Sequence, residues 1–253
     1  MSAFSSPRRL GYVAFALASY GAFLLTAAYA ALFVGNYFPV FHLHGAAFRN
    51  LDAVGDTPFA EAVLVDTLLI ASFGVQHSVM ARQRFKAWWL RFVPAPLERS
   101  VYVLASTACL ALLLAAWRPL GFVLFDVSSG ALGWVLVGVS LFGWVIAVYS
   151  TFLIDHAGLF GLRQVLHPAR AETADDFRTP GLYRAVRHPL YFGFLLAFWA
   201  TPIMSAAHLV FAAGLTLYVL VAIRFEERDL AARFGDRYRD YRKRVRALVP
   251  LPR

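Results

Sequence analysis

Four long apolar segments constrain the fold of this chain more than any other feature. They run near Tyr12 to Val34, Phe59 to Met80, Val101 to Trp117 and Ala131 to Ile154. A hydrocarbon core about 30 Å thick needs roughly 20 apolar residues as helix, because no water is present there to bond free backbone groups. Only 15% of the residues are charged, whereas a soluble domain carries about 25%. The sequence therefore predicts an all-α fold, a polytopic bundle of transmembrane helices.

A fifth apolar stretch, Leu190 to Ile223, is too long for one span. Pro202 interrupts it, with polar neighbours at Thr201, Ser205 and His208. Proline cannot donate a backbone hydrogen bond inside a helix, so we expect a hairpin of two short helices here. The total is then five to six membrane helices.

The distribution of basic residues predicts the orientation in the membrane. Of 24 Lys and Arg, two precede the first span, five lie between Arg82 and Arg99, five between Arg163 and Arg187, and ten from Arg224 onward. Cytoplasmic loops near span ends are enriched in such residues, so we expect both termini at the cytoplasmic side of a bacterial inner membrane. The net charge of +9 is then explained by contact with anionic membrane lipids, and we expect no nucleic-acid partner. No obligate protein partner is inferred.

The last charged stretch predicts an amphipathic C-terminal helix. Apolar and aromatic residues recur beyond Phe225 at steps of three or four, at Leu230, Phe234, Tyr238, Tyr241 and Val245. Such spacing puts them on one face of a helix, which would pack under the bundle or lie at the interface.

Chemistry is concentrated in TPGLYRAVRHPLYFG, from Thr179 to Gly193, and EERDLAARFGDRYRDYRKRV, from Glu226 to Val245. Pro189 is tolerated in the first turn of a helix and biases His188 away from helical geometry. His188 should therefore stand at a helix entrance, where free N–H groups and the helix dipole suit a ligand carboxylate.

Other side chains of these motifs complete a ligand site. Arg184 and Arg187 add positive charge, and Glu226 and Glu227 could receive an amine or ribose hydroxyls. Aromatic faces attract a desolvated cation. Three such residues are present: Phe177, Tyr183 and Tyr191. The single cysteine, Cys109, lies in an apolar run, so no metal site is predicted.

The two motifs resemble the signature of the isoprenylcysteine carboxyl methyltransferase superfamily. The resemblance implies that S-adenosylmethionine is the cofactor, with S-adenosylhomocysteine as its product, and that the segment from Asp175 to Arg178 joins the pocket. The cofactor-binding residues predicted in this way are Phe177, Arg178, Tyr183, Arg187, His188, Pro189, Tyr191, Gly193, Glu226 and Glu227.

Earlier motifs are similar to the bacterial methanethiol S-methyltransferase family. They are QHSVMAR from Gln76, ERSVYVLAS from Glu98 and STFLIDHAGLFGLRQV from Ser150. This resemblance implies an enzyme that methylates a small thiol, methanethiol, to dimethyl sulfide. It predicts one integral-membrane domain over 1–253, with a four-span bundle over 1–154 and the cofactor-binding loop, helical hairpin and C-terminal helix over 155–253.

Because the thiolate is the nucleophile, a base or a positive field is expected near the substrate. An imidazole suits proton transfer near neutral pH. The catalytic candidates are His156, at the end of the fourth span, with its neighbour Asp155, and then His77 in the second span.

Two alternatives stay open at this point. QHSVMAR is also similar to NnrU-type membrane proteins, some of them haem-dependent isomerases, in which His77 and a second histidine would bind iron. A methyltransferase acting on a larger lipophilic acceptor is the other alternative.

Overall fold

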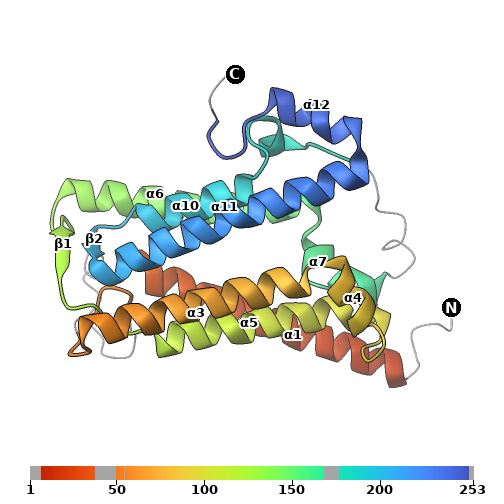
Figure 1. Cartoon of the computed structure of the whole chain (residues 1–253), viewed down its shortest axis with the longest axis horizontal. Helices are drawn as coiled ribbons and strands as arrows, with labels where there is room; N and C mark the ends of the chain where they lie inside the picture. The colour runs from red at the N-terminus through yellow and green to blue at the C-terminus, as the bar shows by residue number, and fades with distance from the viewer. Residues whose placement is uncertain (1–6, 38–49, 54, 168–176, 251–253) are drawn as a thin grey trace. The chain divides into compact units, whose positions relative to one another are not determined.

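The computed structural model describes residues 7–37, 50–53, 55–167 and 177–250. Among these residues, five helices are long and apolar enough to cross a membrane. They are α1 (Pro7–Gly35), α3 (Phe59–Met80), α5 (Glu98–Ala116), α6 (Ala131–Ile154) and α11 (Ala206–Phe234), labelled in Figure 1. The predicted all-α membrane bundle is confirmed, and the four first spans agree with the apolar segments to within a few residues.

Many large apolar side chains on these helices are exposed, as lipid-facing side chains would be. Leu25 on α1 is 76% exposed, Phe152 on α6 is 61% exposed and Leu217 on α11 is 65% exposed. Shorter elements connect the spans: α4 (Gln83–Trp89), η1 (Ala95–Leu97), α7 (His156–Leu159), α8 (Leu162–Leu166) and η2 (Gly181–Arg184).

The predicted hairpin is partly wrong. Its first helix, α10 (Pro189–Trp199), is short, and the chain is interrupted around Pro202 as expected. The second helix, α11, runs for 29 residues through the acidic pair Glu226 and Glu227. It continues because no glycine or proline falls between Leu215 and Phe234.

The predicted C-terminal helix also needs correction. Gly235 separates α11 from α12 (Asp236–Arg244) and has a φ of +58°, a conformation that L side chains rarely adopt. The charged stretch is thus split between two helices. The apolar face of α12 is buried through Tyr238 and Tyr241.

Two short strands, which the sequence pattern did not indicate, join distant parts of the chain. β1 (Val123–Asp126) pairs antiparallel with β2 (Ile203–Ser205), with Val123 opposite Ser205. Close by in sequence, His208 is buried, and its two ring nitrogens lie 2.9 Å from Oδ2 of Asp52 and 2.8 Å from the carbonyl of Phe198. These contacts fix the start of α11.

The described chain divides into two compact units. The first contains the described parts of Met1–Tyr29, Ala71–Ala115 and Asp155–Asp176. The second contains those of Ala30–Ile70, Ala116–Ile154 and Phe177–Arg253. In the second unit α6, α10 and α11 lie side by side (Figure 1).

Close approach of two backbones holds α10 against α6. A Cβ at Gly143 would come within 2.5 Å of the carbonyl oxygen of Gly193, and a Cβ at Gly193 would come equally close to the carbonyl of Gly143. The Ser140 hydroxyl donates to the carbonyl of Ala197 at 3.1 Å, one turn further along. The structure thus gives Gly193 a packing role at the base of the predicted site.

Candidate functional site

The site is built at the start of α10. His188 is the residue that precedes the helix, and Pro189 occupies its first turn, as the sequence predicted. Proline lacks an N–H and has a fixed φ, so it costs little there. The His188 side chain makes no hydrogen bond to cap the helix, yet it is only 5% exposed. Its ring is therefore directed toward other partners.

Those partners are the two neighbouring glutamates of α11. Nε2 of His188 lies 3.2 Å from Oε1 of Glu227, and Nδ1 lies 3.6 Å from Oε2 of Glu226. The Tyr191 ring stacks on the imidazole, with 5.7 Å between ring centroids. The structure thus brings the helix start and the acidic pair together within the second unit.

The two glutamates differ in their surroundings. The Glu226 side chain is 45% exposed, whereas that of Glu227 is 7% exposed. Glu227 also accepts from Nε of Arg187 at 2.7 Å and pairs with Nε of Arg242 at 3.1 Å. Glu226 is therefore the carboxylate that a ligand can reach, while Glu227 is committed to protein cations.

Arg187 does not offer its charge to a ligand in this structure. It is buried, and besides Glu227 it donates from Nη1 to the carbonyls of Arg242 and Val245. Arg184, the last residue of η2, is exposed. Of the two arginines that the sequence placed near a ligand carboxylate, Arg184 is the accessible one.

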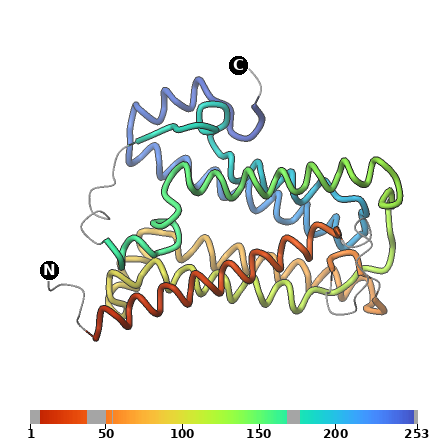
Figure 2. Tube along the Cα trace, turned by 180° about the vertical axis from the view of Figure 1, so that it is seen from behind, coloured from red at the N-terminus to blue at the C-terminus, as the bar shows by residue number. Residues whose placement is uncertain are grey.

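An aromatic cluster joins Phe177 to α11 and α12. The Phe177 ring lies 5.3 Å from that of Phe234, 5.9 Å from Tyr238 and 5.4 Å from Tyr241, between ring centroids. The Tyr241 hydroxyl donates to the carbonyl of Tyr183 at 2.5 Å. Figure 2 shows from behind how α12 lies beside the segment that precedes α10.

The tyrosines of this cluster stay neutral near pH 7. Burial raises the pKa of the Tyr183 phenol, and the negative charge of Glu226 raises it further. Burial raises the pKa of Tyr241 to about 12, although the Arg187 charge opposes that rise. Neutral phenols remain hydrogen-bond donors. Arg178 is exposed next to Phe177, and Asp175 lies outside the described residues.

The predicted catalytic residues belong to the first unit. His156 begins α7, and its Nε2 lies 2.8 Å from the Tyr20 hydroxyl. Burial lowers the pKa of His156, and the negative charge of Asp155 partly offsets this. Asp155 itself caps α7 by accepting from the N–H of Gly158, and it pairs with Arg163 at 2.6 Å. Its observed contacts are thus structural.

His77 lies in a separate cluster of the first unit. Its Nδ1 is 3.1 Å from the Ser106 hydroxyl, and its Nε2 is 2.8 Å from that of Tyr102. The Arg99 guanidinium lies over the Tyr102 ring, 4.7 Å from its centroid. Iron ligation would require one of these hydroxyls to leave the imidazole. Within the described residues, no group of three His, Cys, Asp or Glu is placed to hold a metal ion.

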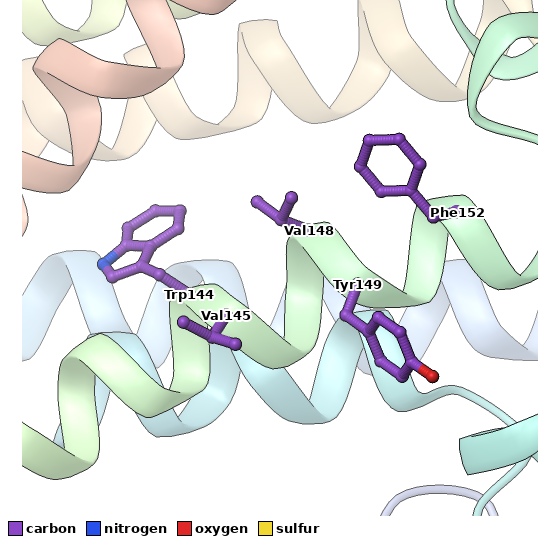
Figure 3. Close-up of a pocket in the computed structure, with 5 residues that line it drawn as sticks. All are labelled: Trp144, Val145, Val148, Tyr149 and Phe152. Atoms are coloured by element: carbon purple, nitrogen blue, oxygen red, sulfur yellow. The ribbon is translucent and has the colours of Figure 1, made fainter.

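An open apolar hollow of about 430 Å³ runs along α6 and is distinct from this site. Figure 3 shows the five side chains of α6 that line it: Trp144, Val145, Val148, Tyr149 and Phe152. The lining is almost wholly apolar, so it offers no partner for a charged ligand. A second hollow, of about 310 Å³, lies against Arg187 and residues 246–249.

Sequence reasoning missed several residues of these clusters. It did not select Arg242, whose Nε the structure places on Glu227. It did not select Tyr20, because a tyrosine in an apolar segment gives no signal of its partner. The regular spacing of Tyr238 and Tyr241 did predict a shared apolar face, and the structure buries both residues.

This chain is similar in sequence to known methyltransferases. The family model for phospholipid methyltransferases matches residues 135–237. Methanethiol S-methyltransferase 2 of Bradyrhizobium diazoefficiens is 49% identical over 244 residues, covering 96% of this chain and 91% of that protein. The methanethiol S-methyltransferase of Mycobacterium tuberculosis is 47% identical over 242 residues, covering 95% and 96%.

More distant similarity extends to eukaryotes. A nurim homologue of Drosophila pseudoobscura pseudoobscura is 32% identical over 179 residues, covering 67% of this chain and 70% of that protein. No solved structure matches the chain significantly.

Proposed function

Because the chain belongs to the methanethiol S-methyltransferase family, we propose that it transfers a methyl group from S-adenosylmethionine to methanethiol. The products are dimethyl sulfide and S-adenosylhomocysteine. The observation that carries this proposal is the bracketing of His188 by Glu226 and Glu227 at the start of α10.

The residues at this place suit the cofactor. Its amine or ribose hydroxyls would meet the half-exposed Glu226. Its carboxylate would meet the first turn of α10, whose N–H groups have no acceptor within the helix, and the exposed Arg184. Tyr191 and Tyr183 supply aromatic surface for its cationic part. Arg187 and Glu227 would not contact the cofactor but would keep His188 in position.

When bound, the cofactor supplies an electrophilic methyl group on a sulfonium. In the transfer that this would allow, the thiolate sulfur would bond to the methyl carbon as the carbon–sulfonium bond breaks, and the electron pair of that bond would stay on the departing sulfur. Catalysis then depends on positioning the thiolate within about 3 to 3.5 Å of that carbon and on removing the thiol proton.

His156 is the proposed acceptor of that proton. Burial lowers the pKa of His156, so its ring is neutral near pH 7 and able to take up a proton. Its hydrogen bond with Tyr20 fixes one ring nitrogen. His77 is the second candidate, although hydroxyls of Ser106 and Tyr102 contact both of its ring nitrogens.

We further propose that the enzyme lies in a bacterial inner membrane with this site on the cytoplasmic side. Basic residues concentrate in the loops at 82–99 and 163–187 and in the segment from Arg224 onward, and the last two of these contribute to the site. S-adenosylmethionine is available in the cytoplasm, so this orientation would give it direct access.

The direct test uses purified protein in detergent with S-adenosylmethionine. Formation of S-adenosylhomocysteine should depend on added methanethiol, and dimethyl sulfide should appear in the headspace. A rate that is equal with and without thiol would contradict the proposal. A larger lipophilic thiol in parallel identifies the alternative acceptor class, and a Soret band in the isolated protein would point to haem instead.

A further inference from the structure

The segment after α12 is joined to the cofactor site by backbone hydrogen bonds. Val186 and Arg246 form a parallel bridge. The N–H of Arg187 donates to the carbonyl of Arg246 at 2.9 Å, and the N–H of His188 donates to that of Ala247 at 3.0 Å. We refer to residues 245–248 as the C-terminal strap.

A buried guanidinium adds a second attachment. Nη1 of Arg187 donates to the carbonyls of Arg242 and Val245, at the end of α12 and the start of the strap. Nε and Nη2 of the same side chain both contact Oε1 of Glu227. The planar guanidinium presents its donors in a fixed geometry, so one side chain ties the strap to α11.

Both kinds of attachment converge on His188. The strap accepts the N–H of His188, and Glu227, which Arg187 holds, contacts its Nε2 at 3.2 Å. The main chain and the ring of the same histidine are thus fixed by groups that depend on the strap. Glu226 then contacts the remaining ring nitrogen.

We propose that the C-terminal strap is a positioning element for S-adenosylmethionine, and that Arg187 is the positioning residue that couples it to Glu227 and His188. This inference rests on the proposed function. Arg187 then acts without touching the cofactor, in contrast to the role that the sequence predicted for it.

The strap follows all five candidate membrane spans found in the described residues, so its removal takes away none of them. A purely structural role would lower the amount of folded enzyme and hence the maximal rate per milligram, with an unchanged KM. A positioning role raises the KM for S-adenosylmethionine and the Kd for S-adenosylhomocysteine, because the binding groups are less well ordered.

The experiment compares two truncations with the full chain. Removal of residues 246–253 deletes the carbonyls of Arg246 and Ala247, which accept the backbone N–H groups of Arg187 and His188. Removal of residues 249–253 keeps both carbonyls and is the matched control. We expect the longer deletion to raise the KM for S-adenosylmethionine about tenfold, as loss of a few modest hydrogen bonds predicts. The control should stay within about twofold, and the KM for methanethiol should not change in either variant.

A second measurement starts from the full chain and is then repeated in both truncations. If strap docking tightens cofactor binding, cofactor binding must stabilise strap docking by the same factor. S-adenosylhomocysteine should therefore slow hydrogen exchange at the N–H groups of Arg187 and His188 in the full chain. This slowing should persist in the control truncation and disappear in the longer one.

The outcomes separate the two proposals. A full-length protein that does not bind S-adenosylhomocysteine would overturn the proposed function before any variant is tested. A full-length protein that binds it, with equal KM and equal exchange in the longer truncation, would overturn the strap's role alone. If the longer truncation does not accumulate in cells, the full chain alone still tests the strap. Its role would be overturned if S-adenosylhomocysteine binding left hydrogen exchange at the N–H groups of Arg187 and His188 unchanged.

Discussion

Nε2 of His188 lies 3.2 Å from Oε1 of Glu227, an oxygen that also accepts from the guanidinium of Arg187. The adjacent Glu226 faces the other ring nitrogen and reaches solvent. Two neighbouring glutamates thus have different roles. One carboxylate is available to a ligand, and the other holds the imidazole and a buried cation in place.

Substitution of the two glutamates should separate these roles. Glu227→Gln leaves the buried Arg187 without its carboxylate, so we expect a loss of about 3–5 kcal/mol in stability. Glu226→Gln removes an exposed charge, so stability should change by no more than about 0.5 kcal/mol. Its KM for S-adenosylmethionine should rise roughly tenfold to a hundredfold, as loss of a charge-assisted hydrogen bond predicts.

Thermal melting in detergent and steady-state kinetics check this pair. The assignment of roles would be reversed if Glu226→Gln were the less stable variant and Glu227→Gln changed only the KM.

The contact between α6 and α10 should tolerate no added methyl group. Gly143→Ala would bring a Cβ to 2.5 Å from the carbonyl of Gly193, so the helices must separate. We expect a loss of about 1–3 kcal/mol, typical of overpacking. Gly138 lies on the same helix, and a Cβ added there would meet nothing within 4 Å, so Gly138→Ala is the matched control.

Resistance to unfolding in sodium dodecyl sulfate measures this difference. Equal resistance of Gly143→Ala and Gly138→Ala would show that α6 and α10 are not in close contact. A displaced α10 would also move His188, so Gly143→Ala should lower activity as well.

The pH dependence of the reaction tests His156. Burial lowers the pKa of His156 below its usual 6.5, so the ring is neutral above that value and becomes protonated as the pH falls. If the neutral ring accepts the thiol proton, kcat/KM should decline on the acid side, below pH 6.5. His156→Asn should lower the rate about a hundredfold and remove this decline. An identical acid limb in the variant would assign the titration to another group.

Much of the fold follows from local sequence pattern. The four first spans and the helix start at Pro189 were predicted because apolar length and proline geometry act locally. The proximity of His188 to Glu226 followed from the expected hairpin. The Gly235 break was missed because the apolar spacing continues across it, and only the positive φ interrupts the helix.

The remaining features depend on partners far away in the chain. The carboxylate of Glu227 is shared by Arg187, His188 and Arg242, and no sequence spacing shows that an arginine of α12 returns to α11. The pairing of β1 with β2, and that of Asp52 with His208, likewise join residues with no local signal. These contacts arise from tertiary packing, which overrides the local pattern.

The sharpest test of the proposed site is headspace chromatography of cells that express the chain and receive methanethiol, compared with cells that express His188→Ala. We predict that dimethyl sulfide appears with the wild type and falls by at least about a hundredfold with the variant, at equal amounts of protein in the membrane. Equal dimethyl sulfide from both would contradict the assignment of the cofactor site to the start of α10.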